Sequence, residues 1–158
     1  MQRRTLNIFI LILIFVFSLC DFGFAKEKAP PAMPPIVKKM VVEAKASIKS
    51  IDMEALKAAI DNKEDVAIID VRVPTEYSTG HIPGSINIPR GLLEFFVWEK
   101  VVGYPEKTDM NKKIYIYCKT GIRAILATKC LQDLGLTNVT QVNMKIADWI
   151  KAGYPIEK

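Results

Sequence analysis

The most informative segment of the chain is Ile114-Tyr115-Ile116-Tyr117-Cys118-Lys119-Thr120-Gly121-Ile122-Arg123. Its first four residues predict a short strand that ends at Cys118. The residues from Ala124 to Leu134 predict a helix that is stopped by Gly135. In open parallel sheets, ligands bind beyond the carboxyl ends of the strands. Cys118 is therefore expected at such a position, between a strand and the helix that follows it.

Patterns of strand and helix continue on both sides of this segment. Asp52 is predicted to cap a helix over Met53–Ile60, and Val66–Ile69 is an unbroken apolar run that suits a strand buried on both faces of a parallel sheet. The other predicted elements are an amphipathic helix over 37–48, strands over 85–88 and 139–142, a helix or loop over 91–102, and a helix over 146–152. This alternation predicts an α/β sandwich, with a central, mostly parallel sheet and helices on both faces.

The segment after Cys118 has features that stabilise negative charge. A six-residue arc that begins with a thiol can turn several backbone N–H groups inward, and Gly121 permits the tight curvature. The amino terminus of the next helix adds a partial positive charge, and Lys119 and Arg123 add two full charges. These features favour a nucleophilic thiolate and an anionic ligand. Taken alone, a cysteine and an arginine at this spacing are equally compatible with a buried structural cysteine.

Composition limits the class of protein. The chain has 158 residues, with 22 Lys plus Arg against 17 Asp plus Glu, which fits one compact domain with an appendage. The mild positive charge is spread along the chain and forms no stripe for nucleic acid. Three cysteines and one histidine are too few for a zinc finger or ribbon, so no metal site is expected.

The first 25 residues have the pattern of a secretory signal. Arg3 and Arg4 precede the apolar run Leu6–Phe17, and Ala25 stands at a small-residue cleavage position. The run is shorter than the ~20 residues that span a bilayer comfortably. We therefore expect cleavage after Ala25 and a periplasmic or secreted protein. The alternative is an uncleaved anchor that holds the domain at the membrane, outside the cytoplasm.

Beyond residue 25, residues 26–47 are expected to form a Pro-rich linker and an amphipathic helix, and residues 48–158 a domain. That domain contains four recognisable groups of residues: Asp70-Val71-Arg72 followed by Glu76-Tyr77, the run Gly80–Pro89, the Cys118 segment, and Trp149 followed by Ala152–Pro155. Their order resembles a single-domain rhodanese, a sulfurtransferase of the exported or periplasmic type. The resemblance covers roughly residues 48–158 and implies the rhodanese-like three-layer sandwich.

The resemblance also implies a function. Cys118 would accept a sulfane sulfur from thiosulfate, or from a related anionic donor, as a persulfide. The cradle around that sulfur would be formed by the five residues of the following loop: Lys119, Thr120, Gly121, Ile122 and Arg123. The persulfide would then pass the sulfur to a thiol, a protein acceptor or cyanide, in a ping-pong reaction without a metal or organic cofactor. Phosphatases on a similar scaffold have one more residue before the arginine, so the shorter loop here predicts a cradle sized for sulfur.

Three further positions are candidates for supporting roles. Asp70 and Arg72 either orient the active loop or brace a turn together with Glu76. Lys145, with Met144, replaces the Gly-Gly usual in the family, and we expect Lys145 to add a third positive charge at the rim of the pocket.

Two other side chains are expected to have structural roles. His81 is expected to hydrogen-bond its own turn. Cys130 is expected in the core, because it lies too far along its helix to form a disulfide with Cys118.

The same residues leave other functions open. The main alternative is a periplasmic carrier or binding protein for sulfane sulfur or polysulfide, with little turnover. A redox or interaction module with an incidental cysteine is a further alternative. A monomer is expected, and contact with a membrane only if the N-terminal segment is retained.

Overall fold

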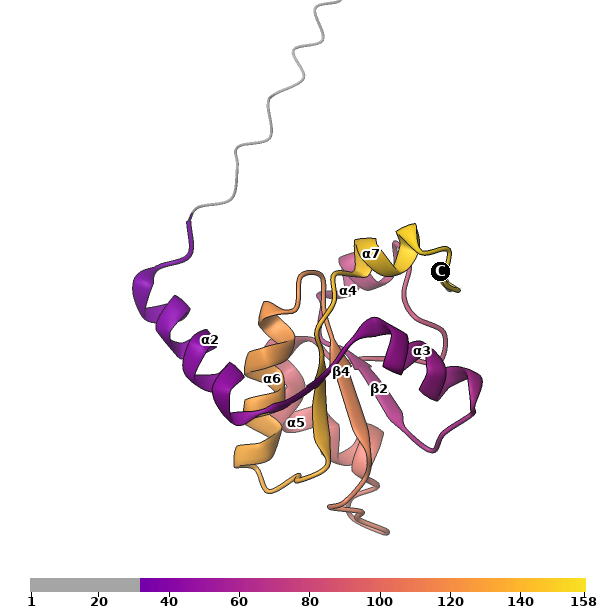
Figure 1. Ribbon diagram of the computed structural model, residues 1–158. Helices are drawn as coiled ribbons and strands as arrows, with labels where there is room; N and C mark the ends of the chain where they lie inside the picture. The colour runs from indigo at the N-terminus through magenta and orange to yellow at the C-terminus, as the bar shows by residue number, and fades with distance from the viewer. Residues whose placement is uncertain (1–31) are drawn as a thin grey trace, which may run out of the picture. The chain divides into compact units, whose positions relative to one another are not determined.

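A computed structural model describes residues 32–158, so the predicted signal segment and most of the predicted linker lie outside the described residues. The centre of the fold is a five-stranded sheet in the order β1-β5-β4-β2-β3, in which every pair is parallel (Figure 1). The strands are β1 (Lys49–Ile51), β2 (Ala67–Asp70), β3 (Ile86–Asn87), β4 (Ile114–Tyr117) and β5 (Val139–Val142).

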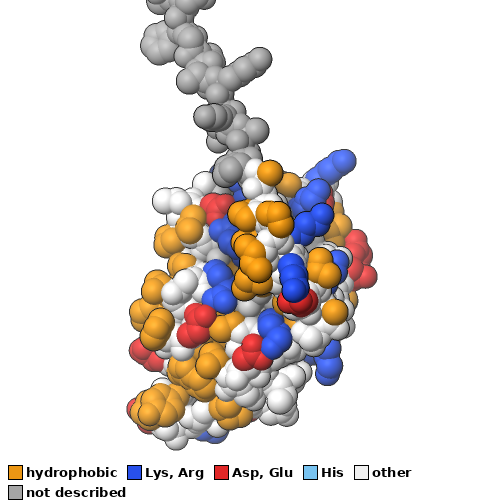
Figure 2. Space-filling view, turned by 90° about the vertical axis from the view of Figure 1, so that its left-hand side faces the viewer, with side chains coloured by type: hydrophobic (Ala, Val, Ile, Leu, Met, Phe, Trp, Pro, Cys, Tyr) orange, Lys and Arg blue, Asp and Glu red, His pale blue; other side chains and the backbone are white. Residues whose placement is uncertain are grey.

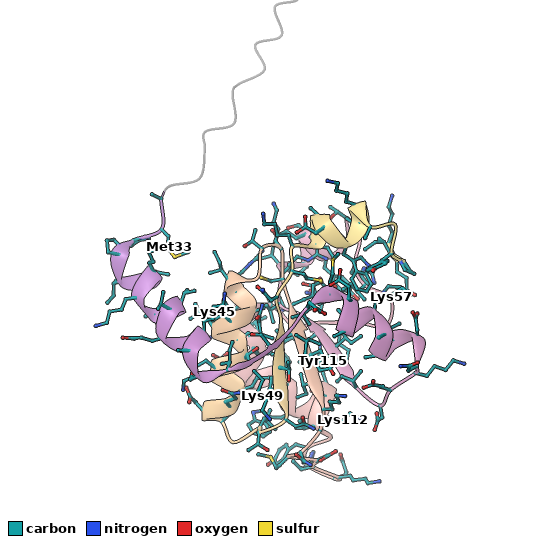
Figure 3. All side chains as sticks on the ribbon, in the orientation of Figure 1. Met33, Lys45, Lys49, Lys57, Lys112 and Tyr115 are labelled. Atoms are coloured by element: carbon teal, nitrogen blue, oxygen red, sulfur yellow. The ribbon has the colours of Figure 1, made fainter. Side chains whose placement is uncertain are left out.

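The strand β4 lies in the middle of the sheet, and all four of its residues are buried. Its alternate side chains point to opposite faces, so Ile114 and Ile116 belong to one apolar cluster and Tyr115 and Tyr117 to another. Figure 3 shows Tyr115 on the side of the sheet that faces Lys57. Burial on both faces explains why β4 reads as a continuous apolar run.

Helices cover both faces of the sheet. They are α2 (Pro35–Ser47), α3 (Met53–Asp61), α4 (Pro74–Tyr77), α5 (Leu93–Val97), α6 (Ile122–Asp133) and α7 (Ile146–Lys151), with a 3-10 turn η1 (Arg90–Leu92) and a π-helical turn η2 (Trp98–Val102). One cluster joins the sheet to α5, η2 and α6, and the other joins it to α3 and α7 (Figure 1). The predicted three-layer α/β sandwich is confirmed.

Local signals fixed several boundaries. The Asp52 carboxylate accepts a hydrogen bond from the Ala55 N–H at 2.8 Å, so it caps α3 as predicted. The bounds of β4 and β5 agree with the prediction, and the segment 91–102 is helical rather than a loop. The strand β1 was not predicted, and α2 begins within the stretch expected to be a linker.

The helix α2 packs against α6, on the outside of the molecule. Its buried residue is Ala44, while Ile36, Met40 and Val42 are exposed. Figure 2 shows this side of the molecule, where hydrophobic side chains are interspersed with basic and acidic ones. Within residues 32–158, no helix combines the length and the apolar character needed to cross a membrane.

Candidate active site

Cys118 follows β4 directly, at the carboxyl end of the central strand, as predicted. It carries a free thiol and is fully buried, in the apolar cluster on the α6 side of the sheet. The neighbouring strand β2 also ends at this edge, where the Val71 N–H donates to the Tyr117 carbonyl at 3.1 Å. Parallel strands therefore bring the segments after β2 and β4 together.

The loop after Cys118 presents backbone N–H groups. Within the described part of the chain, the N–H groups of Lys119, Thr120 and Gly121 donate to no acceptor. The first N–H groups of α6 have no partner inside the helix either. Gly121 has φ +88°, a left-handed conformation that disfavours a side chain, and this conformation turns the chain into α6. The loop can therefore offer hydrogen bonds to an anion.

Arg123 and Lys119, the two cations predicted for the loop, share one carboxylate. Arg123 donates from Nη1 and Nη2 to the two oxygens of Glu76, at 2.7 and 3.1 Å. The Lys119 Nζ lies 3.8 Å from Glu76 Oε1. The hydrogen bond from Arg123 lowers the pKa of Glu76, and the same bond raises the pKa of Arg123. Glu76 is therefore ionised at neutral pH.

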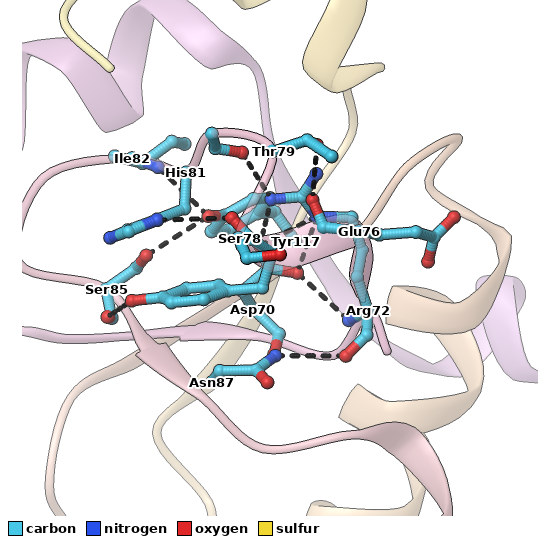
Figure 4. A network of polar contacts seen from close by, with 12 residues as sticks. Asp70, Arg72, Glu76, Ser78, Thr79, His81, Ile82, Ser85, Asn87 and Tyr117 are labelled. Atoms are coloured by element: carbon cyan, nitrogen blue, oxygen red, sulfur yellow. Dashed lines mark hydrogen bonds and ion pairs between the residues drawn. The ribbon is translucent and has the colours of Figure 1, made fainter. Parts of the chain in front are cut away.

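Asp70 and Arg72 form a buried ion pair at the end of β2 (Figure 4). The Arg72 Nε donates to both carboxylate oxygens of Asp70, at 3.0 and 2.8 Å, and Nη2 lies 2.6 Å from Oδ2. Nη2 also donates to the Gly80 carbonyl at 2.8 Å, so the pair fixes the turn that precedes His81. Glu76 takes no part in this pair, which corrects the predicted brace of three residues.

Tyr117 supports the residues that follow His81. Its hydroxyl accepts a hydrogen bond from the Ile82 N–H at 3.1 Å and lies 3.1 Å from the Ser85 hydroxyl. Burial, together with the negative charge of Asp70, raises the pKa of the Tyr117 phenol. The phenol is therefore neutral and acts as a hydrogen-bonding group in the turn.

His81 has the structural position expected for it. Its ring stacks on Tyr77 with 3.7 Å between the ring centroids, and Nδ1 lies 3.3 Å from the Tyr77 carbonyl oxygen. Its backbone exchanges two hydrogen bonds with Glu157, each of 2.9 Å. These contacts join the turn to the carboxyl-terminal segment of the chain.

The turn that carries Met144 and Lys145 lies against the Cys118 loop. The Ile146 N–H donates to the Lys119 carbonyl at 3.2 Å, and a Cβ on Gly121 would lie 3.6 Å from the Met144 oxygen. Met144 is buried in the second cluster, whereas Lys145 is exposed at the start of α7.

A cavity of about 290 Å³ opens beside the loop. It is lined by Arg72, Thr75, Glu76, Thr79, Gly80, Lys119, Ile146 and Ile150. The structure thus brings Arg72 and Lys119 to the same cavity and does not place Lys145 in its wall. Among residues 32–158, no three metal-ligating side chains lie close enough to hold a metal ion.

Cys130 is not the core residue that was expected. It is half-buried in α6, and its Sγ donates to Glu94 Oε1 at 3.0 Å. Burial, with this hydrogen bond, raises its pKa to about 11. Cys130 is therefore a weak nucleophile, and it is separated from the loop by two turns of helix.

Glu76 is the residue at this edge whose pairing the sequence reasoning missed. The sequence predicts Glu76 as a partner of Asp70 and Arg72, rather than of Arg123. The sequence contains a signal for this pairing. A carboxylate follows the end of one parallel strand, and two cations follow the end of the neighbouring strand.

Comparison with known proteins places this geometry in a family. A family model for the rhodanese-like domain matches residues 52–152. A thiosulfate:glutathione sulfurtransferase of Saccharomyces cerevisiae is 33% identical over 68% of this chain and 82% of its own length. A Bacillus subtilis protein named as a candidate sulfur carrier, YrkF, is 34% identical over 68% of this chain, and the match spans about half (54%) of that protein.

A solved structure from Rhodopseudomonas palustris has a TM-score of 0.67, with 34% identity over 81% of this chain and 98% of its own. That protein is described as one of unknown function and a possible tyrosine phosphatase. The family match covers the strands β2 to β5, the Cys118 loop and the helices α3 to α7, and it begins directly after β1. The chain belongs to the rhodanese-like domain family, and sulfurtransferases are among its relatives.

Proposed function

We propose that this protein is a thiosulfate sulfurtransferase that carries sulfur as a persulfide on Cys118. The observation that carries the proposal is the position of this thiol at the end of the central strand. It is followed by three loop N–H groups that have no acceptor in the described part of the chain, and then by Arg123 in the first turn of α6. Such a site stabilises a thiolate and the anion that it attacks.

The proposed reaction has two steps. The Cys118 thiolate attacks the outer sulfur of thiosulfate, a new S–S bond forms, the S–S bond of thiosulfate breaks, and sulfite leaves with the electron pair. An acceptor thiolate or cyanide then attacks the outer sulfur of the persulfide, and Cys118 leaves as the thiolate. The N–H groups from Lys119 to Arg123, with the Lys119 and Arg123 side chains, stabilise the negative charge in both steps.

The spacing in the loop favours sulfur over phosphate. Four residues separate Cys118 from Arg123, one fewer than in phosphatases of similar scaffold. The name of the yeast relative supports thiosulfate as donor and a thiol as acceptor. We further propose that Asp70 and Arg72 support the turn beside the loop, and that the chain is exported by residues 1–25.

A sulfur carrier with little turnover is the second candidate. The burial of Cys118 favours it, because a fully buried thiol is shielded from small acceptors in solution. A protein partner that opens the loop on docking would then be the natural acceptor. The name of the Bacillus subtilis relative agrees with this candidate.

Intact-protein mass spectrometry tests the proposal. Addition of thiosulfate is expected to add the mass of one sulfur atom, and addition of small thiols is expected to remove it. Cys118→Ser is expected to lose this increment and the formation of thiocyanate from cyanide, while the matched variant Cys130→Ser keeps both. Activity that survives in Cys118→Ser would contradict the mechanism. A persulfide that only a protein partner discharges would favour the carrier.

The role proposed for Lys145 has its own test. Although exposed outside the wall of the cavity, its charge is expected to attract thiosulfate toward the loop. The KM for thiosulfate should therefore rise in Lys145→Ala and remain unchanged in Lys151→Ala, which removes the same charge at the far end of α7. Equal KM values for Lys145→Ala and the parent would reject the role.

A further inference from the structure

The carboxylate of Glu76 contacts both cationic side chains of the loop. It accepts two hydrogen bonds from Arg123, at 2.7 and 3.1 Å, and lies 3.8 Å from the Lys119 Nζ. Because its pKa is lowered by Arg123, it stays ionised in neutral and mildly acidic solution. The loop therefore presents its cations already partly neutralised.

Charged side chains also line the cavity beside the loop. Glu76 and Lys119 both line it, and the third charged lining residue, Arg72, is neutralised by Asp70 at 2.6 Å. Arg123 does not line the cavity, but it is hydrogen-bonded to Glu76 at 2.7 Å. Lys119 and Arg123 are therefore two cations opposed by one carboxylate, and together the three side chains carry one net positive charge, whereas the two cations alone would carry two. A dianion such as thiosulfate brings more negative charge than this site can balance.

We propose that Glu76 is a specificity-determining residue that selects sulfur donors by their charge. The proposal rests on the proposed function. Coulomb energy is proportional to the charge of the ligand, so the repulsion from Glu76 acts twice as strongly on a dianion as on a monoanion at the same position. Glu76 therefore lowers the affinity for thiosulfate most, and favours singly charged donors of the thiosulfonate and persulfide classes.

A matched pair of donors isolates the effect of charge. Thiosulfate and methanethiosulfonate both carry an outer, transferable sulfur on a sulfonyl sulfur, and their charges are two and one. In each case the Cys118 thiolate forms a bond to the outer sulfur and the S–S bond of the donor breaks. The electron pair leaves with sulfite from thiosulfate, and with methanesulfinate from methanethiosulfonate. The chemical step is the same, so a difference between the donors reports on binding of charge.

The test compares Glu76→Gln with the parent. The glutamine oxygen can still accept a hydrogen bond from Arg123, while the negative charge is gone. We expect the KM for thiosulfate to fall about tenfold and the KM for methanethiosulfonate about threefold, because the fold-change for the dianion is the square of that for the monoanion. Both changes should shrink as salt rises toward 1 M, where the screening length is about 3 Å.

A matched control removes the same charge elsewhere. Glu64 pairs with Lys113 at 2.6 Å, before the amino ends of β2 and β4, and Glu64→Gln should leave both KM values unchanged. Equal fold-changes for the two donors in Glu76→Gln would overturn the proposal. So would a higher KM for both, because Glu76 would then serve only to position Arg123.

A binding measurement separates this proposal from the proposed function. If neither donor loads sulfur on Cys118 in the parent, the proposed function fails, whatever Glu76 does. Titration with sulfate, a dianion that transfers no sulfur, still measures the site by calorimetry. Tighter sulfate binding in Glu76→Gln than in the parent and in Glu64→Gln would support the charge selection by Glu76, and unchanged binding would refute it.

Discussion

Replacement of Arg72 by methionine is expected to cost the domain a large part of its stability. The side chains of Asp70 and Arg72 are 0% and 4% exposed, and two nitrogens of Arg72 contact the Asp70 carboxylate. Arg72→Met would leave that carboxylate buried without its cation and the Gly80 carbonyl without its donor. Removal of one partner from a buried pair costs about 3–5 kcal/mol, against a typical total of about 5–15 kcal/mol.

This loss corresponds to a fall in Tm of roughly 10–20 °C for a domain of this size. Urea unfolding, followed by circular dichroism, measures the free energy directly. The double variant Asp70→Asn/Arg72→Met removes both charges and keeps an oxygen for the Arg72 backbone N–H, which Asp70 Oδ1 now accepts at 2.9 Å. It should recover about half of the loss, because no unpaired charge stays buried.

A surface pair provides the control for this experiment. Lys57 and Asp61 are 2.6 Å apart, with side chains 24% and 58% exposed, and Lys57→Met should cost less than about 1 kcal/mol. The reasoning would be refuted by an Arg72→Met variant within about 1 kcal/mol of the parent, or by a double variant no more stable than the single one.

Three further predictions concern Gly121 in the loop, the pair of Glu76 and Arg123, and the thiol of Cys130. Gly121→Ala should lose about 1–2 kcal/mol in urea unfolding, because φ is +88° there, whereas Gly91→Ala should lose far less; equal losses would argue against strain at the loop. Because Arg123 lowers the pKa of folded Glu76, their pairing stabilises the fold above the usual Glu pKa, and this contribution is lost as pH falls through the lowered value. The parent should therefore lose more stability than Glu76→Gln in acid unfolding below pH ~4.5. Cys130, with a pKa of about 11, should react with iodoacetamide at pH 8 roughly a hundred times more slowly than a model thiol, as measured by peptide mass spectrometry; a rate near that of the model thiol would contradict its burial.

Most of the fold was accessible from local patterns. The buried runs at β2 and β4 were visible because a strand covered on both faces needs apolar residues at every position. The strand β1 could not be predicted from the sequence, because Lys49-Ser50-Ile51 is short and largely exposed. It forms because it pairs with β5 at the edge of the sheet. Local strand propensity does not predict such a pairing between distant segments.

The candidate site was predictable in part for a similar reason. Cys118 and its loop are one continuous segment, so the order of their residues is enough to predict that they surround the amino terminus of a helix. The partner of Arg123 comes from a different segment, and the sequence suggested that Glu76 would join Asp70 and Arg72 instead. In the structure, Asp70 pairs with Arg72, which is two residues away in the same segment. Glu76 pairs with Arg123, and these two side chains meet only because β2 and β4 lie side by side.

By itself, the sequence determined the alternation of strands and helices, the parallel sheet and the position of Cys118 at the end of a strand. These features follow from the periodicity of apolar residues and from the residues that begin and end helices, and both act over a few neighbouring positions. Only the tertiary structure decided that Glu76 neutralises Arg123 and that Lys145 stays outside the cavity wall. The pairing of Glu76 with Arg123 depends on the distance between two segments far apart in the chain, and that distance exists only after the strands have assembled into the sheet.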